Sequence, residues 1–283
     1  MHILVCIKQV PDSAQIRINP VTQTIMRQGV PTIINPYDLF SLEEALRLRD
    51  SFGGEVTVLT MGPPMAADSL RKTLAIGADR AVLLTDRSFA GSDTLATSYA
   101  LAQAIRKIGE LFGKPDLVFA GKQTIDGDTA QVGPGVAKRL DLLQLTYVAK
   151  IVECDPDKRE IIVERRSEGG VHVLKTKLPC LITMMEGSNV VRRGAMNDAL
   201  RAARAEIGTW SAKDAGIEDI AKCGLKGSPT VVKKVFAPPP RSERAILVEP
   251  GDTASQAAES LIDTLFKRQP ALEQDLIKSA AEF

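Results

Sequence analysis

The first half of the sequence alternates between short apolar runs and longer segments of helical period. The apolar runs are rich in β-branched residues, as are strands buried on both faces of a sheet. They cover residues 3–7, 55–61, 80–84, 116–120 and 144–148. The segments between them keep apolar residues on one face and end near Gly53, Gly77 and Gly113, the residue type that commonly terminates helices. This alternation predicts an α/β fold with a mostly parallel, twisted sheet.

Beyond residue 150 the hydrophobic period changes to two. In residues 161–165 and 171–175, apolar and charged side chains alternate on either side of a Gly169-Gly170 turn. Such a pattern predicts an antiparallel hairpin with one face in solvent. Residues 181–184 are apolar and predict one more core strand.

The remainder of the chain lacks the rhythm of a sheet. Helical patterns over 195–207 and 253–267 flank a stiff, extended segment with three prolines at 238–240. We therefore expect an α/β domain at 1–185 and an extended C-terminal arm with a partner-docking segment at 186–283. Apolar residues are sparse in this arm, so it packs either on its own domain or on a partner protein.

Composition narrows the classes of function. The 283 residues carry a net charge of +1 and only 4% aromatic side chains, which argues against a nucleic-acid-binding protein. Two histidines, and four separated cysteines without a Cys-x-x-Cys motif, give no sign of a metal site or a disulfide scaffold. No apolar stretch reaches the roughly 18 residues of a membrane span, and the N-terminal run is too short for a signal peptide. We expect a soluble, cytoplasmic protein.

The polar segment 121–134 follows a predicted strand, where parallel sheets bind their ligands. We expect Asp128 or Thr129 to cap the helix that begins there, and the amides of its first turn to favour an anion. Glycines let the backbone approach a ligand closely, and Lys122 offers a charge for phosphate. Asp126 and Asp128 suit ribose hydroxyls or adenine, or they accept hydrogen bonds from amides of the loop.

Other loops of the predicted sheet leave two interpretations open. Asn35 caps the helix that starts with Pro36, or it contacts a ligand. Lys8 either reaches a ligand or is a solvated lysine at the end of a strand. Asp93 or Thr94 either caps the following helix or contacts a ligand. Neither a P-loop nor Gly-x-Gly-x-x-Gly follows the first strand, which disfavours a conventional kinase or dehydrogenase.

Four segments of the sequence resemble, in order, the beta subunit of electron-transfer flavoproteins. They are residues 5–11, 35–38, 61–63 and 121–134. The resemblance implies a Rossmann-like, adenine-nucleotide-binding sheet, with a structural AMP in ordinary members and an additional FAD in the electron-bifurcating branch. The residues from 126 to 134 and the pair at 93–94 are similar to the bifurcating branch, because small residues stand where AMP-type members have bulkier ones. FAD is therefore expected in preference to AMP.

The resemblance also implies the residues of the site. It implies no catalytic side chain and no metal ligand. The strand-end residues would line the nucleotide, residues 35–38 would contact adenosine or pyrophosphate, and residues 121–132 would wrap phosphates and ribose, with residues 93–94 nearer the flavin. The cofactor-binding residues that it implies are Cys6, Lys8, Asn35, Pro36, Tyr37, Asp38, Met61, Gly62, Asp93, Thr94, Gly121, Lys122, Gln123, Thr124, Ile125, Asp126, Gly127, Asp128, Thr129, Ala130, Gln131 and Val132.

The implied partners follow from the same resemblance. They are an alpha subunit in a heterodimer, NADH as electron donor, an acyl-CoA dehydrogenase or related dehydrogenase, and a low-potential acceptor such as ferredoxin or flavodoxin. The chain departs from the family at 186–193, where many members carry an Asn-x-Pro-Arg-Tyr docking segment. In this segment and the predicted helix that follows it, a basic group either faces an acidic partner or is a solvated surface. It consists of Arg192, Arg193, Arg201 and Arg204.

Two other classes remain compatible with an α/β sheet. A universal-stress-type module would bind ATP or AMP without redox chemistry, and an adenylating ATP-pyrophosphatase would release pyrophosphate. Each of them normally offers a Gly-rich or Ser-rich phosphate loop, which the sequence lacks.

Overall fold

The computed structural model describes residues 1–12, 31–233, 247–248 and 251–280. Its two compact units are Met1–Phe236 and Ala237–Phe283. The domain boundary expected at residue 185 stays a prediction, and the prolines at 238–240 lie outside the described residues.

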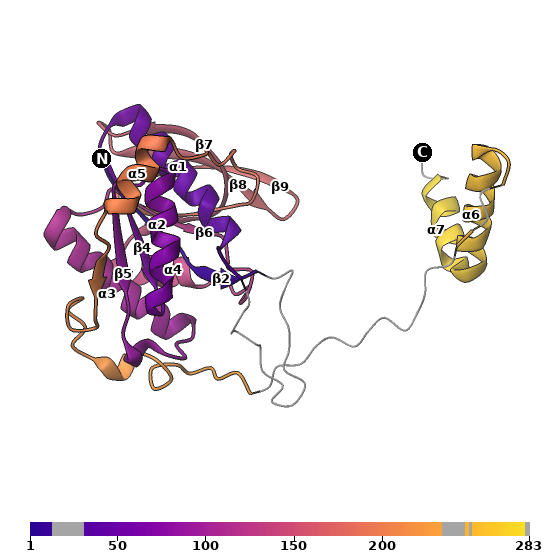
Figure 1. Ribbon diagram of the computed structural model, residues 1–283. Coiled ribbons are helices and arrows are strands. Elements are labelled where there is room, and N and C mark those ends of the chain that lie inside the picture. The colour runs from indigo at the N-terminus through magenta and orange to yellow at the C-terminus, as the bar shows by residue number, and fades with distance from the viewer. Residues whose placement is uncertain (13–30, 234–246, 249–250, 281–283) are drawn as a thin grey trace. The chain divides into compact units, whose positions relative to one another are not determined.

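The first unit is built on a mixed sheet (Figure 1). In the described residues, nine strands follow the order β11-β5-β4-β1-β6-β10-β7-β8-β9, and β2 pairs with β3 separately. Neighbours from β11 through β7 are parallel, whereas β7, β8 and β9 are antiparallel. The predicted α/β class, mostly parallel sheet and antiparallel hairpin are confirmed. The strands are β1 His2–Cys6, β2 Gln9–Pro11, β3 Thr32–Ile34, β4 Glu55–Met61, β5 Arg80–Leu84, β6 Leu117–Gly121, β7 Leu143–Asp155, β8 Glu160–Ser167, β9 Gly170–Lys177, β10 Cys180–Met184 and β11 Gly208–Trp210.

Helices cover both faces of the parallel part of the sheet. Apolar residues of α1, α2 and α5 pack into one cluster, and those of α3 and α4 pack into another. Strand β1 serves both clusters, because Ile3 and Val5 face the first and Leu4 faces the second. All three side chains are 0% exposed, and each contributes about 1.5–3 kcal/mol through burial. The helices are α1 Pro36–Phe52, α2 Ala67–Ile76, α3 Thr94–Phe112, α4 Val132–Leu140, α5 Met196–Arg204, α6 Ala254–Arg268 and α7 Pro270–Ala280.

Strand β7 is longer than its apolar pattern predicted. It runs for 13 residues, because its first part pairs with β10 and its second part continues into the hairpin with β8. Tyr147 lies where the pairing becomes irregular, at a φ of 58°, and its N–H donates to Thr183 Oγ1 at 3.1 Å.

Three short elements were missed by the sequence pattern. The helix expected at 195–207 ends at Arg204, and strand β11, which follows it at Gly208–Trp210, pairs with β5. Strands β2 and β3 pair in a short ribbon that the sequence analysis did not predict. Each of these strands has three residues, too few to display a period.

The second unit contains α6 and α7. The helix expected at 253–267 is confirmed as α6, which begins with a capping box between Thr253 and Gln256. Helix α7 was not predicted. Among the described residues, no helix combines the length and apolar character needed to cross a membrane.

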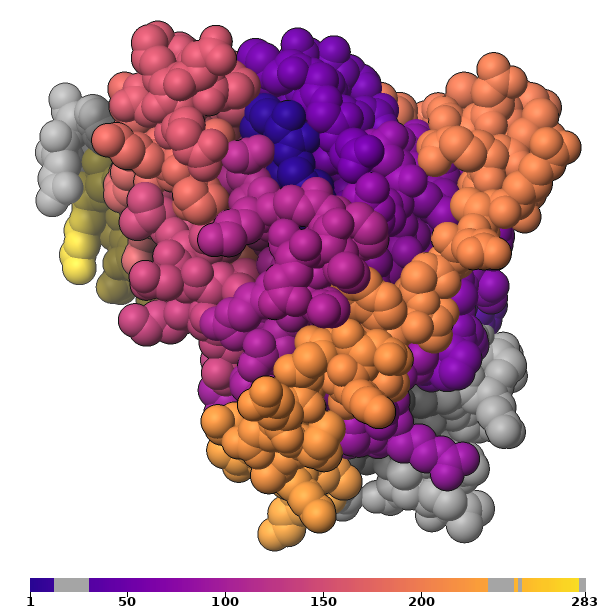
Figure 2. Space-filling model, turned by 90° about the vertical axis from the view of Figure 1, so that its left-hand side faces the viewer, coloured from indigo at the N-terminus to yellow at the C-terminus, as the bar shows by residue number. Residues whose placement is uncertain are grey.

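The chain after β11 lies against the α3 side of the sheet. Ala212, Ala215, Ile217 and Cys223 are buried in the same cluster as α3. Figure 2 shows this orange segment as a band across the purple and magenta surface. This part of the expected arm therefore packs on its own domain.

Candidate functional site

The candidate loops meet where the order of the sheet reverses. From β1 the chain moves outward to β4 and β5, and then returns to β6 on the other side of β1. In open α/β sheets, ligands bind at this point, beyond the carboxyl ends of the strands. Lys8 follows β1 and the segment 121–134 follows β6, so the topology brings these two predicted elements together.

A buried carboxylate, Asp38 of α1, joins the ends of both strands. One oxygen accepts from the N–H of Lys8 at 2.7 Å, and the other accepts from the N–H of Gly121 at 3.1 Å. Burial raises the pKa of Asp38 to about 7, although these hydrogen bonds oppose the rise. The Asp38 side chain thus holds the backbone at the ends of β1 and β6 together.

Asn35 does not cap α1, contrary to one interpretation of the sequence. It occupies the N-cap position without a side-chain capping bond. Its amide instead donates to the carbonyl of Gln123 at 2.9 Å and accepts from the N–H of Ile125 at 3.2 Å. Since Asn35 is fully buried, it anchors the segment 121–134 to the start of α1.

An ion pair connects the two sides of the reversal point. Lys8 Nζ lies 2.8 Å from both carboxylate oxygens of Asp126. The two side chains are 45% and 27% exposed, respectively. The sequence analysis treated Lys8 and Asp126 separately, whereas the structure shows that their side chains form an ion pair.

The segment 121–134 is tightly turned. The N–H groups of Gly127 and Asp128 both donate to the carbonyl of Thr124, and Gln123 Nε2 donates to Asp128 Oδ1 at 2.8 Å. Asp128 and Ala130 have φ values of 50° and 55°, a strained region for residues with a Cβ that is frequent at functional sites.

The expected helix cap at Asp128 or Thr129 is wrong. Helix α4 begins at Val132, and its N-cap is Gln131, which forms no side-chain capping bond. Asp128 faces Gln123 instead, three residues before the N-cap. The first amides of α4 are therefore not used by a capping side chain and remain suited to an anion.

At the start of α3, Asp93 is confirmed as the helix cap. It accepts from the N–H groups of Leu95 and Ala96. Its second oxygen accepts from the N–H and hydroxyl of Thr230, at 3.1 and 2.8 Å. Burial acts against the charge, but these hydrogen bonds hold the pKa of Asp93 below its ordinary value. Next to it, Thr94 Oγ1 donates to Gln131 Oε1 at 2.9 Å, which joins α3 to the segment 121–134.

Lys122 forms its ion pair with Glu186. Its ammonium lies 3.4 Å from Glu186 and stacks over the rings of Tyr37 and Tyr147, with centroid distances of 4.9 and 5.8 Å. The side chain is 14% exposed. The role that the sequence gave it, a charge for phosphate, stays a prediction.

Three further predicted residues line the same edge of the sheet. Burial raises the pKa of the Cys6 thiol to about 12, and the charge of Asp38 adds to the rise, so the thiol is protonated and unreactive. Met61 ends β4, which is paired with β1. Gly62 donates its N–H to the carbonyl of Leu84 at 3.1 Å.

Glycines in this region differ in the space around them. A Cβ on Gly121 would collide with the Asp38 carboxylate and with Tyr37 Cβ, at 2.7 Å from the latter. A Cβ on Gly127 would meet only Thr124 Oγ1 within 4 Å, at 3.3 Å. Gly121 is thus required by internal packing, whereas the space beside Gly127 is largely open.

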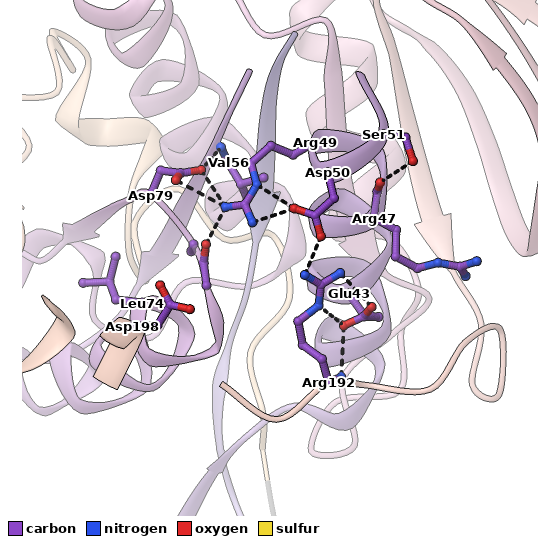
Figure 3. Close-up of polar contacts among 12 residues, drawn as sticks. Glu43, Arg47, Arg49, Asp50, Ser51, Val56, Leu74, Asp79, Arg192 and Asp198 are labelled. Atoms are coloured by element: carbon purple, nitrogen blue, oxygen red, sulfur yellow. Dashed lines mark hydrogen bonds and ion pairs between the residues drawn. The ribbon is translucent and has the colours of Figure 1, made fainter. Parts of the chain in front are cut away.

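The segment 186–193 is fixed to α1 by charges that the sequence analysis missed (Figure 3). The side chain of Arg192 donates to both oxygens of Glu43, at 2.9 and 3.1 Å, and to Asp50 at 2.6 Å. Asp50 in turn accepts from Arg49. Glu43 lies on the buried side of α1. A charged residue on the buried side of a helix needs a partner, and this is the signal in the sequence that could have indicated the network.

The expected basic group is therefore divided. Arg201 donates to the carbonyls of Leu74 and Ala78, so it holds α5 to α2, as Arg192 holds its segment to α1. Neither of the two sequence interpretations anticipated these internal contacts. Arg193 and Arg204 are exposed.

Comparison with known proteins places the fold and these loops in one family. Residues 22–215 match the electron transfer flavoprotein domain. Protein FixA of Azorhizobium caulinodans is 75% identical, with 98% of each chain covered. Protein FixA of Azotobacter vinelandii is 64% identical over 99% of this chain and 100% of its own length. The electron transfer flavoprotein subunit beta of Clostridium acetobutylicum is 51% identical over 83% of this chain and 87% of its own. The chain belongs to the electron-transfer flavoprotein family, as a subunit of the beta type.

Proposed function

We propose that this subunit binds FAD with the loops at the reversal point of its sheet and works with an alpha subunit in flavin-based electron bifurcation. In this proposal NADH supplies the electrons. One electron passes to a second flavin and a dehydrogenase of the acyl-CoA type, and the other to a low-potential acceptor such as ferredoxin or flavodoxin. Similarity to a subunit named beta supports an alpha partner.

The space beside Gly127 is the observation that carries the choice of FAD. A dinucleotide needs more room than AMP, and a Cβ at residue 127 would meet only Thr124 Oγ1 within 4 Å. The uncapped start of α4 offers amides for a pyrophosphate. Asp128 offers an acceptor for a ribose hydroxyl. The residues present therefore fit an adenine dinucleotide.

The protein would contribute position and electrostatics. Bound FAD supplies hydride acceptance and single-electron transfer. Asn35 and Asp38 keep the loops in register through their buried hydrogen bonds. The start of α3, with Asp93 and Thr94, is tied to the same loops by Gln131 and would place a positive helix end near the flavin.

Counting nucleotides in the purified heterodimer tests this function. After denaturation, two FAD per heterodimer are expected. One FAD together with one AMP would reject bifurcation through this subunit and support the alternative, a non-bifurcating carrier with a structural AMP. Tightly held ATP in a colourless protein would favour the non-redox, stress-type module.

Gly127→Leu provides a matched variant for the same measurement. The larger side chain fills the space beside the turn, so FAD content should fall more than AMP content. Unchanged flavin content would mean that the turn is a structural helix entry and not a ligand contact.

A further inference from the structure

The four loops contain more acidic than basic side chains. In the segments 5–11, 35–38, 61–63 and 121–134, the acidic residues are Asp38, Asp126 and Asp128, and the basic residues are Lys8 and Lys122. Lys122 pairs with Glu186. The ammonium of Lys8, by contrast, is bound within the four loops, by Asp126.

Both ends of the Lys8–Asp126 pair are held in place by buried groups. Asp38 accepts from the N–H of Lys8. Asn35 binds the carbonyl of Gln123 and the N–H of Ile125, the residue before Asp126. The carboxylate is thereby presented to Lys8 by the fold, and both its oxygens lie at the same 2.8 Å from Nζ.

We propose that Asp126 is a specificity-determining residue that competes with the ligand's phosphate for Lys8. The carboxylate of Asp126 already occupies the position beside the Lys8 ammonium that a ligand's phosphate would take. Asp126 must therefore move before the phosphate can bind Lys8. A nucleoside without phosphate meets no such competition. The carboxylate therefore lowers the affinity for phosphorylated nucleotides relative to nucleosides, and it favours ligands whose phosphates gain enough from backbone amides to displace it. This inference rests on the proposed nucleotide site.

The test compares AMP with adenosine by isothermal titration of the full chain, purified with its alpha partner and freed of nucleotide. Asp126→Asn should raise the affinity for AMP about five-fold, because removing one charge near an exposed lysine changes an interaction of this order. Its affinity for adenosine should stay within about two-fold. In a Lys8→Met background, Asp126→Asn should raise AMP affinity by clearly less than about five-fold, since no cation remains to be released and only repulsion of the phosphate is removed.

Asp155→Asn is the matched control. Asp155 pairs with Lys158 at 2.6 Å and is 25% exposed, close to the 27% of Asp126, but it lies on the β7–β8 hairpin. Asp155→Asn removes the same charge and the same kind of lysine contact. Asp126→Ala serves as a second variant, and thermal unfolding checks that each variant is folded.

The outcomes separate the two proposals. Weaker binding of both ligands by Asp126→Asn would make Asp126 a ligand contact and overturn the competition. If Asp126→Asn binds AMP no more tightly than Asp155→Asn does, the competition is overturned as well. If neither the wild-type complex nor any Asp126 variant binds AMP or adenosine, the nucleotide site itself fails and the competition fails with it.

Discussion

Arg192→Ala tests whether the charge network on α1 fixes the segment 186–193. The variant removes three side-chain hydrogen bonds, two to Glu43 and one to Asp50. The bond from the backbone N–H of residue 192 to Glu43, at 3.0 Å, survives. Pairing raises the pKa of Arg192, mainly through its hydrogen bonds with Glu43, so the guanidinium stays charged.

The expected loss of stability follows from the exposure of each group. Glu43 is 6% exposed, and leaving a buried carboxylate without its partner costs about 3–5 kcal/mol. Arg192 is 30% exposed, which puts the cost at the lower end. Asp50 is 46% exposed and adds about 0–1 kcal/mol. We expect about 3 kcal/mol in total.

Urea unfolding of the full chain measures this loss. With a slope of about 3 kcal/mol per molar, the midpoint should fall by about 1 M without a change in slope. Arg193→Ala is the control, because its side chain is exposed and should change stability by less than about 0.5 kcal/mol. If both variants unfold at the same urea concentration, the network does not hold the segment.

Three further predictions concern the loops. Gly121→Ala should lower the free energy of unfolding by more than about 1 kcal/mol, because its Cβ collides with the fixed carboxylate of Asp38. Gly127→Ala should change the free energy of unfolding by less than about 0.5 kcal/mol. Thermal unfolding measures both, and equal losses would contradict this prediction. The folded protein keeps a proton on Asp38 up to about pH 7, while the unfolded chain loses it near pH 4, so stability should fall as pH rises through this window, by at most about 4 kcal/mol. Asp38→Asn should flatten that part of the pH profile, and an unaltered profile would refute the assignment. Asp93→Ala should cost about 1–2 kcal/mol and speed proteolysis near Thr230, which loses its acceptor; unchanged cleavage would show that this contact does not hold the segment.

The parallel core was predictable from the sequence because its strands are buried on both faces. Strands at 55–61 and 80–84 were located to the residue, since short continuous apolar runs between helical segments predict buried strands. The short strand β11 was not predictable, because its place beside β5 depends on tertiary pairing.

The candidate site was predictable as a set of loops but not as a set of contacts. Residues after parallel strands must gather at one edge, and this brought Lys8 near Asp126. The choice of partner was different: Asn35 had local reasons to cap α1, yet its side chain binds a segment about 90 residues away. Such long-range hydrogen bonds leave no local pattern, and Tyr147 at positive φ leaves none either.

Hydrogen–deuterium exchange of the heterodimer, with and without added FAD, measures the central claim most directly. The account predicts slower exchange on binding in residues 35–38, 93–96 and 121–133, around the reversal point of the sheet. Stoichiometric FAD binding that leaves exchange in all three segments unchanged would contradict it.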